Sequence, residues 1–183
     1  ERLGIAGTHA VATLHRPSNV DDPARLRALL LVLGEIAGEV PLVLPLHPRT
    51  RARARDAGLD ALLQAPGLHA CEPLGYLDFL KLMATASVVL TDSGGIQEET
   101  TALGVPCLTL RENTERPVTV EQGTNTMVGR DRGAILRGVD EILAGRGKRG
   151  RVPELWDGNA AERIAGDLWR WLAVPAAEVA EAA

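Results

Sequence analysis

Apolar residues follow two alternating patterns along this 183-residue chain. Short runs rich in Val, Leu and Ile alternate with longer segments in which apolar residues recur at helical spacing. This alternation predicts an α/β fold, a Rossmann-like parallel sheet flanked by helices. The predicted strands are 10–14, 41–46, 67–72, 87–91, 106–110 and 124–128.

The clearest helical segment begins at Pro23, behind an N-cap at Asp21 or Asp22, and ends near Gly38. Its apolar positions predict one buried face: Leu26, Leu29, Leu30, Leu33, Ile36 and Ala37. Further helices are predicted over 50–57, 76–84, 94–103, 131–143 and 159–172. The inward residues of the fourth of these are Ile135, Leu136, Val139, Ile142 and Leu143. The last helix carries Ile164, Leu168, Trp169 and Trp171. We predict a long polar loop over 111–123 and a frayed tail over 175–183.

The junction after the fourth predicted strand is a candidate phosphate site. Ser93, Gly94 and Gly95 form a tight turn that leads directly into a helix. Unpaired N–H groups and the positive end of the helix dipole would meet there, an arrangement that binds phosphate. Glu99 follows within the same helix, where its carboxylate could accept hydrogen bonds from sugar hydroxyls. The alternative is a turn with no ligand, since glycine pairs are common between strands and helices.

Other polar residues follow the carboxyl ends of predicted strands, where open α/β sheets bind ligands. His15 and Arg16 suit an anionic substrate, although a solvated loop histidine is the alternative. His47 lies beside prolines and is interpreted as part of a rigid turn. Arg116 either donates to a ligand or joins ion pairs that order the 111–117 loop. Residues interpreted as solvated or as strand-edge positions are Arg49, Arg51, Arg53, Arg55, His9 and His69.

Composition narrows the class of protein. The net charge is -4 and no basic stripe carries aromatic residues, so nucleic acid is not an expected partner. No run of about 18 apolar residues predicts a membrane helix. Cys71 and Cys107 lack metal-ligand spacing and are interpreted as reduced core thiols of a cytoplasmic protein without metal or cofactor. The length suits one domain over 1–183, and the opening residues look like the end of a helix, so we expect a piece of a longer protein.

Four segments together resemble one family. They are 13–21, 91–99, 111–117 and 123–129, and the match runs in order from Thr8 to Leu172. The chain closely resembles the non-hydrolysing UDP-N-acetylglucosamine 2-epimerases. The resemblance implies the C-terminal, UDP-binding half of a two-domain enzyme of the glycosyltransferase-B type, homodimeric at full length and active in polysaccharide biosynthesis. It implies interconversion of UDP-GlcNAc and UDP-ManNAc by elimination and readdition of UDP.

The resemblance also implies roles for particular residues. His15 matches the family's functional, catalytic histidine, with Arg16 beside it on the UDP side. Ser93, Gly94 and Gly95 match the diphosphate turn, Glu99 the ribose ligand, Arg116 the arginine of the family's Thr-Glu-Arg-Pro loop and Phe79 a residue near the uracil. Leu74 departs from the pattern, since a polar residue contacting the base can occur there. The acid–base carboxylates belong to the N-terminal half, so the chain alone is expected to be inactive.

Two other functions remain open from the sequence. One is a glycosyltransferase of the same architecture, and the other is a non-catalytic UDP-sugar-binding module. The run from Asp92 to Glu99 favours the epimerase. A uronic acid relative of the sugar stays open as the substrate.

Overall fold

The computed structural model describes residues 7–173, so the tail predicted over 175–183 lies outside the described residues. The chain divides into two compact units, Glu1–Arg151 and Val152–Ala183. The first unit contains the sheet, and the described part of the second contains helix α8 (Ala160–Ala173).

The first unit is built on a six-stranded sheet in the order β3-β2-β1-β4-β5-β6. All five pairings between neighbouring strands are parallel, which confirms the predicted sheet. Each observed strand lies within its predicted range. The strands are β1 (Ala10–Thr13), β2 (Leu42–Pro45), β3 (Leu68–Cys71), β4 (Val88–Thr91), β5 (Cys107–Thr109) and β6 (Asn125–Met127).

The predicted helices are present with boundaries that shift by at most two residues. They are α2 (Pro23–Glu39), α3 (Pro48–Asp56), α4 (Tyr76–Ala84), α5 (Gly94–Leu103), α7 (Arg132–Leu143) and α8. Asp22 caps α2 by accepting from the N–H groups of Ala24 and Arg25. Two short elements have no counterpart in the prediction, α1 (Pro17–Val20) and the 3-10 helix η1 (Asp60–Gln64).

The prediction of a continuous loop over 111–123 is wrong, because α6 (Pro117–Glu121) interrupts it. Pro117 stands at the first helical position, where its fixed φ favours the helix. The hydroxyl of Thr119 donates to the Arg116 carbonyl over 2.8 Å and closes this single turn.

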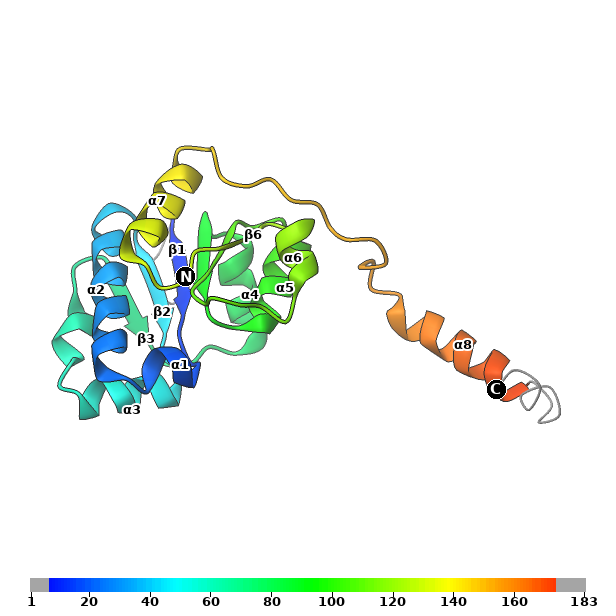
Figure 1. The fold of residues 1–183 in the computed structure, drawn as a ribbon, viewed down its shortest axis with the longest axis horizontal. Coiled ribbons are helices and arrows are strands. Elements are labelled where there is room, and N and C mark those ends of the chain that lie inside the picture. The colour runs from blue at the N-terminus through cyan, green and yellow to red at the C-terminus, as the bar shows by residue number, and fades with distance from the viewer. Residues whose placement is uncertain (1–6, 174–183) are drawn as a thin grey trace. The chain divides into compact units, whose positions relative to one another are not determined.

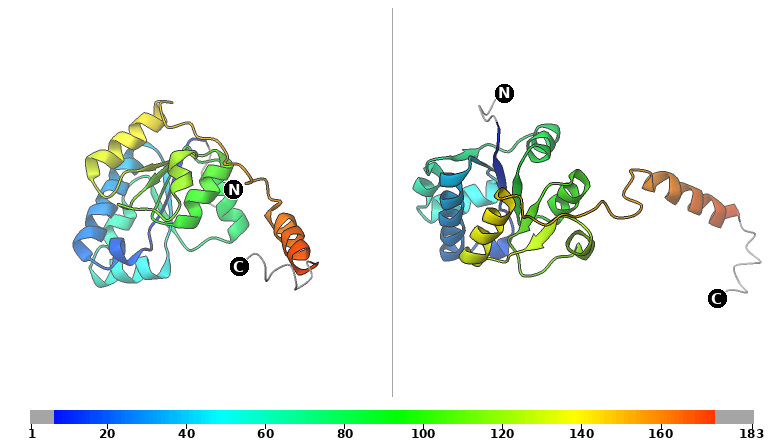
Figure 2. Two further views of the ribbon diagram at one scale, coloured as in Figure 1. Left: turned by 45° about the vertical axis from the view of Figure 1, so that its right-hand side comes forward. Right: turned by 90° about the horizontal axis from the view of Figure 1, so that it is seen from above.

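Alternate residues of the central strands face opposite sides of the sheet. Ala10 and Ala12 belong to the larger apolar cluster, with α2 and with Ile135 of α7, whereas Val11 packs with Met83 of α4. Helices α2 and α7 therefore cover one face, and α4 and α5 cover the other (Figures 1 and 2). Parallel strands buried on both faces are expected to be continuous apolar runs, as they are here.

The predicted buried face of α2 is confirmed, since all six of its named residues are at most 5% exposed. In α7, Ile135 and Val139 are buried, but Leu143 in the last turn is exposed, so that inward position is wrong. His9 is also not a surface residue: its ring is buried beside the carbonyls of Gly7 and Leu82. His69 is exposed on the edge strand β3, as predicted.

The cysteines and α8 complete the description. Both thiols are free; Cys107 is fully buried, which raises its pKa to about 12, whereas Cys71 on the edge strand is only half-buried.

In α8, Ile164, Leu168 and Trp171 follow one another at helical spacing and are exposed. Among residues 7–173, none of the helices has the length and hydrophobicity that a membrane span requires.

Candidate functional site

The loops that follow β1, β2 and β4 meet around one cavity of about 380 Å³ at the carboxyl edge of the sheet. His15 and His47 line it from two of these loops, with their ring centroids 5.5 Å apart. Ser93 lines it from the third loop. Phe79 and Leu74 contribute apolar surface from the α4 side. The cavity therefore combines an apolar wall with imidazole and hydroxyl groups.

Asp92 holds the His15 loop in place. The backbone N–H of His15 donates to its carboxylate at 3.1 Å, and that of Arg16 donates at 3.0 Å. The ring of His15 approaches the same carboxylate, with Nδ1 2.9 Å from Oδ1. The side-chain amide of Asn19 donates to Oδ2 at 3.1 Å. Burial opposes ionisation of Asp92, yet the hydrogen bonds from His15 and Arg16 keep the pKa of its carboxyl below the usual value.

The N-terminus of α5 lies next to the cavity and has no side-chain cap at Ser93. The N–H of Ser93 itself donates to the hydroxyl of Thr91 over 3.0 Å, so this amide is occupied. Gly94 and Gly95 start the helix, and the first amides of a helix have no intrahelical acceptor. A β-carbon added at either glycine would have no neighbour nearer than 3.9 Å. Both glycines therefore leave room for a ligand at this helix end.

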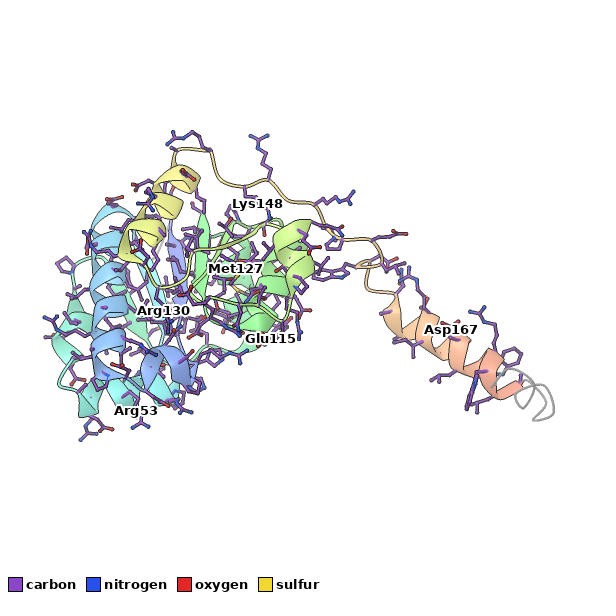
Figure 3. All side chains as sticks on the ribbon, viewed as in Figure 1. Arg53, Glu115, Met127, Arg130, Lys148 and Asp167 are labelled. Carbon is purple, nitrogen blue, oxygen red and sulfur yellow. The ribbon has the colours of Figure 1, made fainter. Side chains whose placement is uncertain are left out.

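Two arginines converge beside Gly94. Nη2 of Arg16 and Cγ of Arg116 each lie 4.0 Å from the place where a β-carbon of Gly94 would stand, and Oε2 of Glu115 lies 3.9 Å from it. Nε of Arg16 is buried and has no hydrogen-bond partner among the described residues. Figure 3 labels Glu115, which lies with Arg116 on the segment between β5 and α6. The cluster is basic, with a carboxylate near its centre.

Ion pairs order the loop that supplies Arg116. Arg111 donates to both carboxylate oxygens of Glu115 at 2.9 and 2.8 Å, and these bonds lower the pKa of Glu115 to about 2. Arg116 pairs with Glu98 of α5, its Nε 2.9 Å from Oε1. Ion pairing within the loop is therefore present. It also places Arg116 at the helix end, so the two sequence interpretations of this arginine do not exclude each other.

His47 has the structural role that its proline neighbours indicate. Its Nδ1 accepts from the N–H of Arg49 at 3.1 Å and caps α3. The arginines of α3 are exposed as predicted, and Arg49 and Arg53 share Asp21 as an ion-pair partner.

Glu99 lies apart from the cavity lining, half-buried on α5. Burial and the neighbouring charge of Glu98 both raise the pKa of its carboxyl. Among the predicted site residues, the structure thus brings His15, Phe79 and Ser93 to the cavity. It gathers Arg16, Gly94 and Arg116 beside the cavity and places Glu99 further along the helix.

Sequence reasoning missed the buried polar residues that hold the loops of the site in place by hydrogen bonds. Asp92, Asn19 and Gln97 are fully buried polar residues, and none of them was assigned a role. For Asp92 a signal existed, because a carboxylate directly after a buried strand needs partners. Asn19 and Gln97 carried no comparable signal.

The fold and the site together define an α/β domain of the glycosyltransferase-B type, with its ligand groups at the carboxyl edge of the sheet. A model of the family described as UDP-N-acetylglucosamine 2-epimerase matches residues 5–168, and the chain belongs to this family. The UDP-N-acetylglucosamine 2-epimerase of Methanocaldococcus jannaschii is 41% identical over 163 residues, which cover 87% of this chain and 44% of that protein.

Two further comparisons bear on the ligand. A solved structure of the M. jannaschii enzyme in complex with UDP-GlcNAc and UDP superposes with a TM-score of 0.81 at 38% identity, over 89% of this chain and 45% of that one. The UDP-2,3-diacetamido-2,3-dideoxy-D-glucuronate 2-epimerase of Pseudomonas aeruginosa is 42% identical over 137 residues, 73% of this chain and 37% of that protein. The chain spans less than half the length of each of these relatives.

Proposed function

We propose that this chain is the UDP-binding half of a two-domain, non-hydrolysing UDP-N-acetylglucosamine 2-epimerase. The diphosphate of UDP binds at the N-terminus of α5. The observation that carries the proposal is the convergence of Arg16 and Arg116 beside Gly94, at a helix end without a side-chain cap. The Arg16 guanidinium, the neighbouring Arg116 side chain and the first amides of the helix form a strong combination for a doubly charged diphosphate.

The neighbouring residues suit the other parts of the nucleotide. The uracil ring stacks in the cavity against Phe79, with Leu74 beside it. Glu99 accepts hydrogen bonds from the ribose, one turn further along α5. His15 faces the sugar–phosphate junction from the β1 loop, where an imidazole can stabilise the charge that develops on departing UDP.

The reaction is interconversion of UDP-GlcNAc and UDP-ManNAc, by elimination of UDP and its readdition on the opposite face of the sugar. This isomerase chemistry also needs an acid and a base beside the sugar ring. We assign these carboxylates to a second, N-terminal domain, so the 183-residue chain alone does not turn over substrate.

Three features of the biological setting are proposed with the activity. The full-length enzyme is a homodimer, it lies in the cytoplasm, and it supplies sugars for polysaccharide biosynthesis. The two free thiols agree with a reducing compartment. UDP-GlcNAc is the proposed substrate, and the uronic acid derivative named for the P. aeruginosa relative is the competitor to test against it.

Calorimetric titration of the chain with UDP, uridine and ADP tests the nucleotide site. We expect saturable binding of UDP and much weaker binding of uridine, which lacks the diphosphate. Arg16→Gln and Arg116→Gln should each weaken UDP binding by about tenfold or more, the range for charge-assisted hydrogen bonds. Arg55→Gln, an exposed arginine near the end of α3, is the matched control and should bind normally.

Two results would contradict the proposal. The first is equal binding of UDP and uridine, which would remove the diphosphate site. The second is formation of UDP-ManNAc from UDP-GlcNAc by the 183-residue chain alone, which would refute the assignment of the acid–base groups to another domain.

A further inference from the structure

We propose that Asp92 is a positioning residue that fixes the tautomer and the orientation of His15, so that His15 presents Nε2 to the ligand. The inference rests on the proposed function for the identity of that ligand, but the Asp92–His15 relationship can be measured without it. The carboxylate and the ring belong to different segments, the end of β4 and the loop after β1.

The contact with Asp92 determines which ring nitrogen of His15 carries the proton. A carboxylate only accepts hydrogen bonds, so at 2.9 Å from Oδ1 the Nδ1 atom of His15 must carry the proton. Nε2 is then unprotonated in neutral His15 and carries a second proton in the imidazolium form. The hydrogen bond made by Nδ1 therefore determines the protonation of Nε2 in the neutral ring.

Several hydrogen-bond donors surround the Asp92 carboxylate, which favours its ionised form and fixes its position. It is fully buried, it accepts from two successive backbone N–H groups and from Asn19, and its Oδ1 lies 2.9 Å from Nδ1 of the ring. Asn19 is in turn fastened to the carbonyl of Leu110 at 2.9 Å. These bonds hold the carboxylate still while the ring of His15 remains about one-third exposed at the cavity.

The contact with Asp92 therefore fixes the orientation of the His15 imidazole. With Nδ1 held, the ring cannot flip to exchange its nitrogens, and Nε2 is the nitrogen available on the cavity side. When both ring nitrogens carry a proton, Nε2–H donates to a phosphate oxygen of the nucleotide. A buried aspartate that holds the correct tautomer of a histidine is an established device in enzymes.

Nitrogen-15 NMR of the histidine rings, recorded in the chain at a pH where they are neutral, tests the inference directly. We expect His15 to be mainly the Nδ1–H tautomer. In Asp92→Asn the amide can donate to Nδ1, so the ratio should invert toward Nε2–H. His47 is the internal reference: its Nδ1 accepts from a backbone N–H, so it should be Nε2–H in both proteins.

Asn19→Ala separates positioning of the ring from general support of the loop. It removes one donor to Asp92 but leaves the carboxylate, so the His15 tautomer should stay Nδ1–H. If His15 in the unsubstituted chain is mainly Nε2–H, the inference is overturned, and this measurement does not depend on whether any variant folds. An unchanged tautomer in folded Asp92→Asn would overturn it equally.

A thermodynamic cycle with UDP connects the tautomer to binding. Asp92→Asn should weaken UDP binding by about tenfold when His15 is present and by clearly less in the His15→Ala background, where only the lost contact with the Arg16 N–H remains. Equal losses in both backgrounds would show that Asp92 acts on UDP by another route, and would overturn the inference while the UDP site stands. Absence of UDP binding by the unsubstituted chain would instead refute the proposed function and leave the NMR result intact.

Discussion

The hydroxyl of Thr114 donates a hydrogen bond of 2.6 Å to Oε1 of Gln97 and so fastens the arginine loop to helix α5. The same oxygen accepts from the side-chain amide of Asn125 at 3.1 Å, and Nε2 of Gln97 donates to the Ser93 carbonyl at 3.1 Å. Gln97 is fully buried, and its bond with Asn125 is made away from water. One side chain thus connects the loop of Arg116, strand β6 and the turn at the proposed phosphate site.

The first prediction concerns this connection. Thr114→Val keeps the shape of the side chain but removes the bond to Gln97 and the acceptor of the Arg116 N–H. We expect a loss of about 1–3 kcal/mol in the free energy of unfolding, measured in urea, because the Arg116 N–H loses its acceptor and Oε1 of Gln97 loses one of its two donors. UDP binding should weaken as well, since Arg116 loses its fixed position. Thr114→Ser retains the hydroxyl and should behave nearly like the unsubstituted chain; an equal loss in both would contradict the argument.

The strands could be predicted from the sequence because each is a continuous apolar run bounded by Pro, Gly or polar residues. Residues 88–91, for example, are fully buried within the predicted range 87–91. The order of the strands could not be predicted in the same way. It depends on pairings such as Ala10 with Val88, which lie far apart in the chain and leave no local pattern. The single turn α6 was missed because five residues are too few to show helical periodicity.

The residues that line the site could be predicted, but the long-range hydrogen bonds that position them could not. His15, Arg16 and Ser93 follow strand ends, and parallel strands bring their carboxyl ends to one edge. The bond between Asp92 and His15 spans 77 positions, and nothing near either residue in the sequence specifies the other. His9 was misplaced for the same reason, since its ring is buried by a contact with Leu82, 73 positions away.

The second prediction separates binding from stability at Gly94. Alanine fits there in the free protein, because its β-carbon would have no neighbour nearer than 3.9 Å. A Gly-to-Ala change at a compatible helical position stabilises by about 0.4–1 kcal/mol. The added methyl nevertheless stands where the diphosphate must approach the amides, so UDP affinity should fall at least about tenfold.

Gly38→Ala is the control for this effect. Gly38 lies in α2, and a β-carbon added there would meet nothing within 4 Å, so the substitution should raise the melting temperature slightly and leave UDP titration unchanged. Normal UDP affinity in Gly94→Ala would place the diphosphate elsewhere.

The third prediction compares two glycines with similar backbone angles. Gly58 has φ +65° and Gly67 has φ +77°, so alanine is strained at both. A β-carbon at Gly58 would meet nothing within 4 Å, whereas at Gly67 it would collide with the carbonyl of Ala37. Gly58→Ala should cost about 1–2 kcal/mol for the left-handed conformation alone. Gly67→Ala should cost about 1–3 kcal/mol more in the free energy of unfolding. Urea denaturation of both variants measures this difference. Equal costs would show that the backbone at the end of α2 moves to make room for the added methyl group.

The fourth prediction concerns acid. The pKa of the Asp92 carboxyl is lower in the folded chain than its ordinary value of about 3.9, despite burial, because His15 and Arg16 donate to it. A lowered pKa stabilises the fold above the unfolded pKa, and this contribution is lost as the pH falls through the folded pKa. Below about pH 4 the free energy of unfolding should therefore fall more steeply in the unsubstituted chain than in Asp92→Asn.

Urea denaturation at pH 6, 5, 4 and 3 checks this difference in slope. Other paired carboxylates titrate in the same range, and Glu115 with a pKa of about 2 is one of them. They are present in both proteins, so their contribution cancels in the comparison. Asp92→Asn should be the less stable protein at pH 6, and the two free energies should approach each other as the pH falls. Parallel curves would mean that Asp92 is protonated to the same extent in the folded and unfolded chains, which its contacts with two backbone N–H groups and an imidazole should prevent.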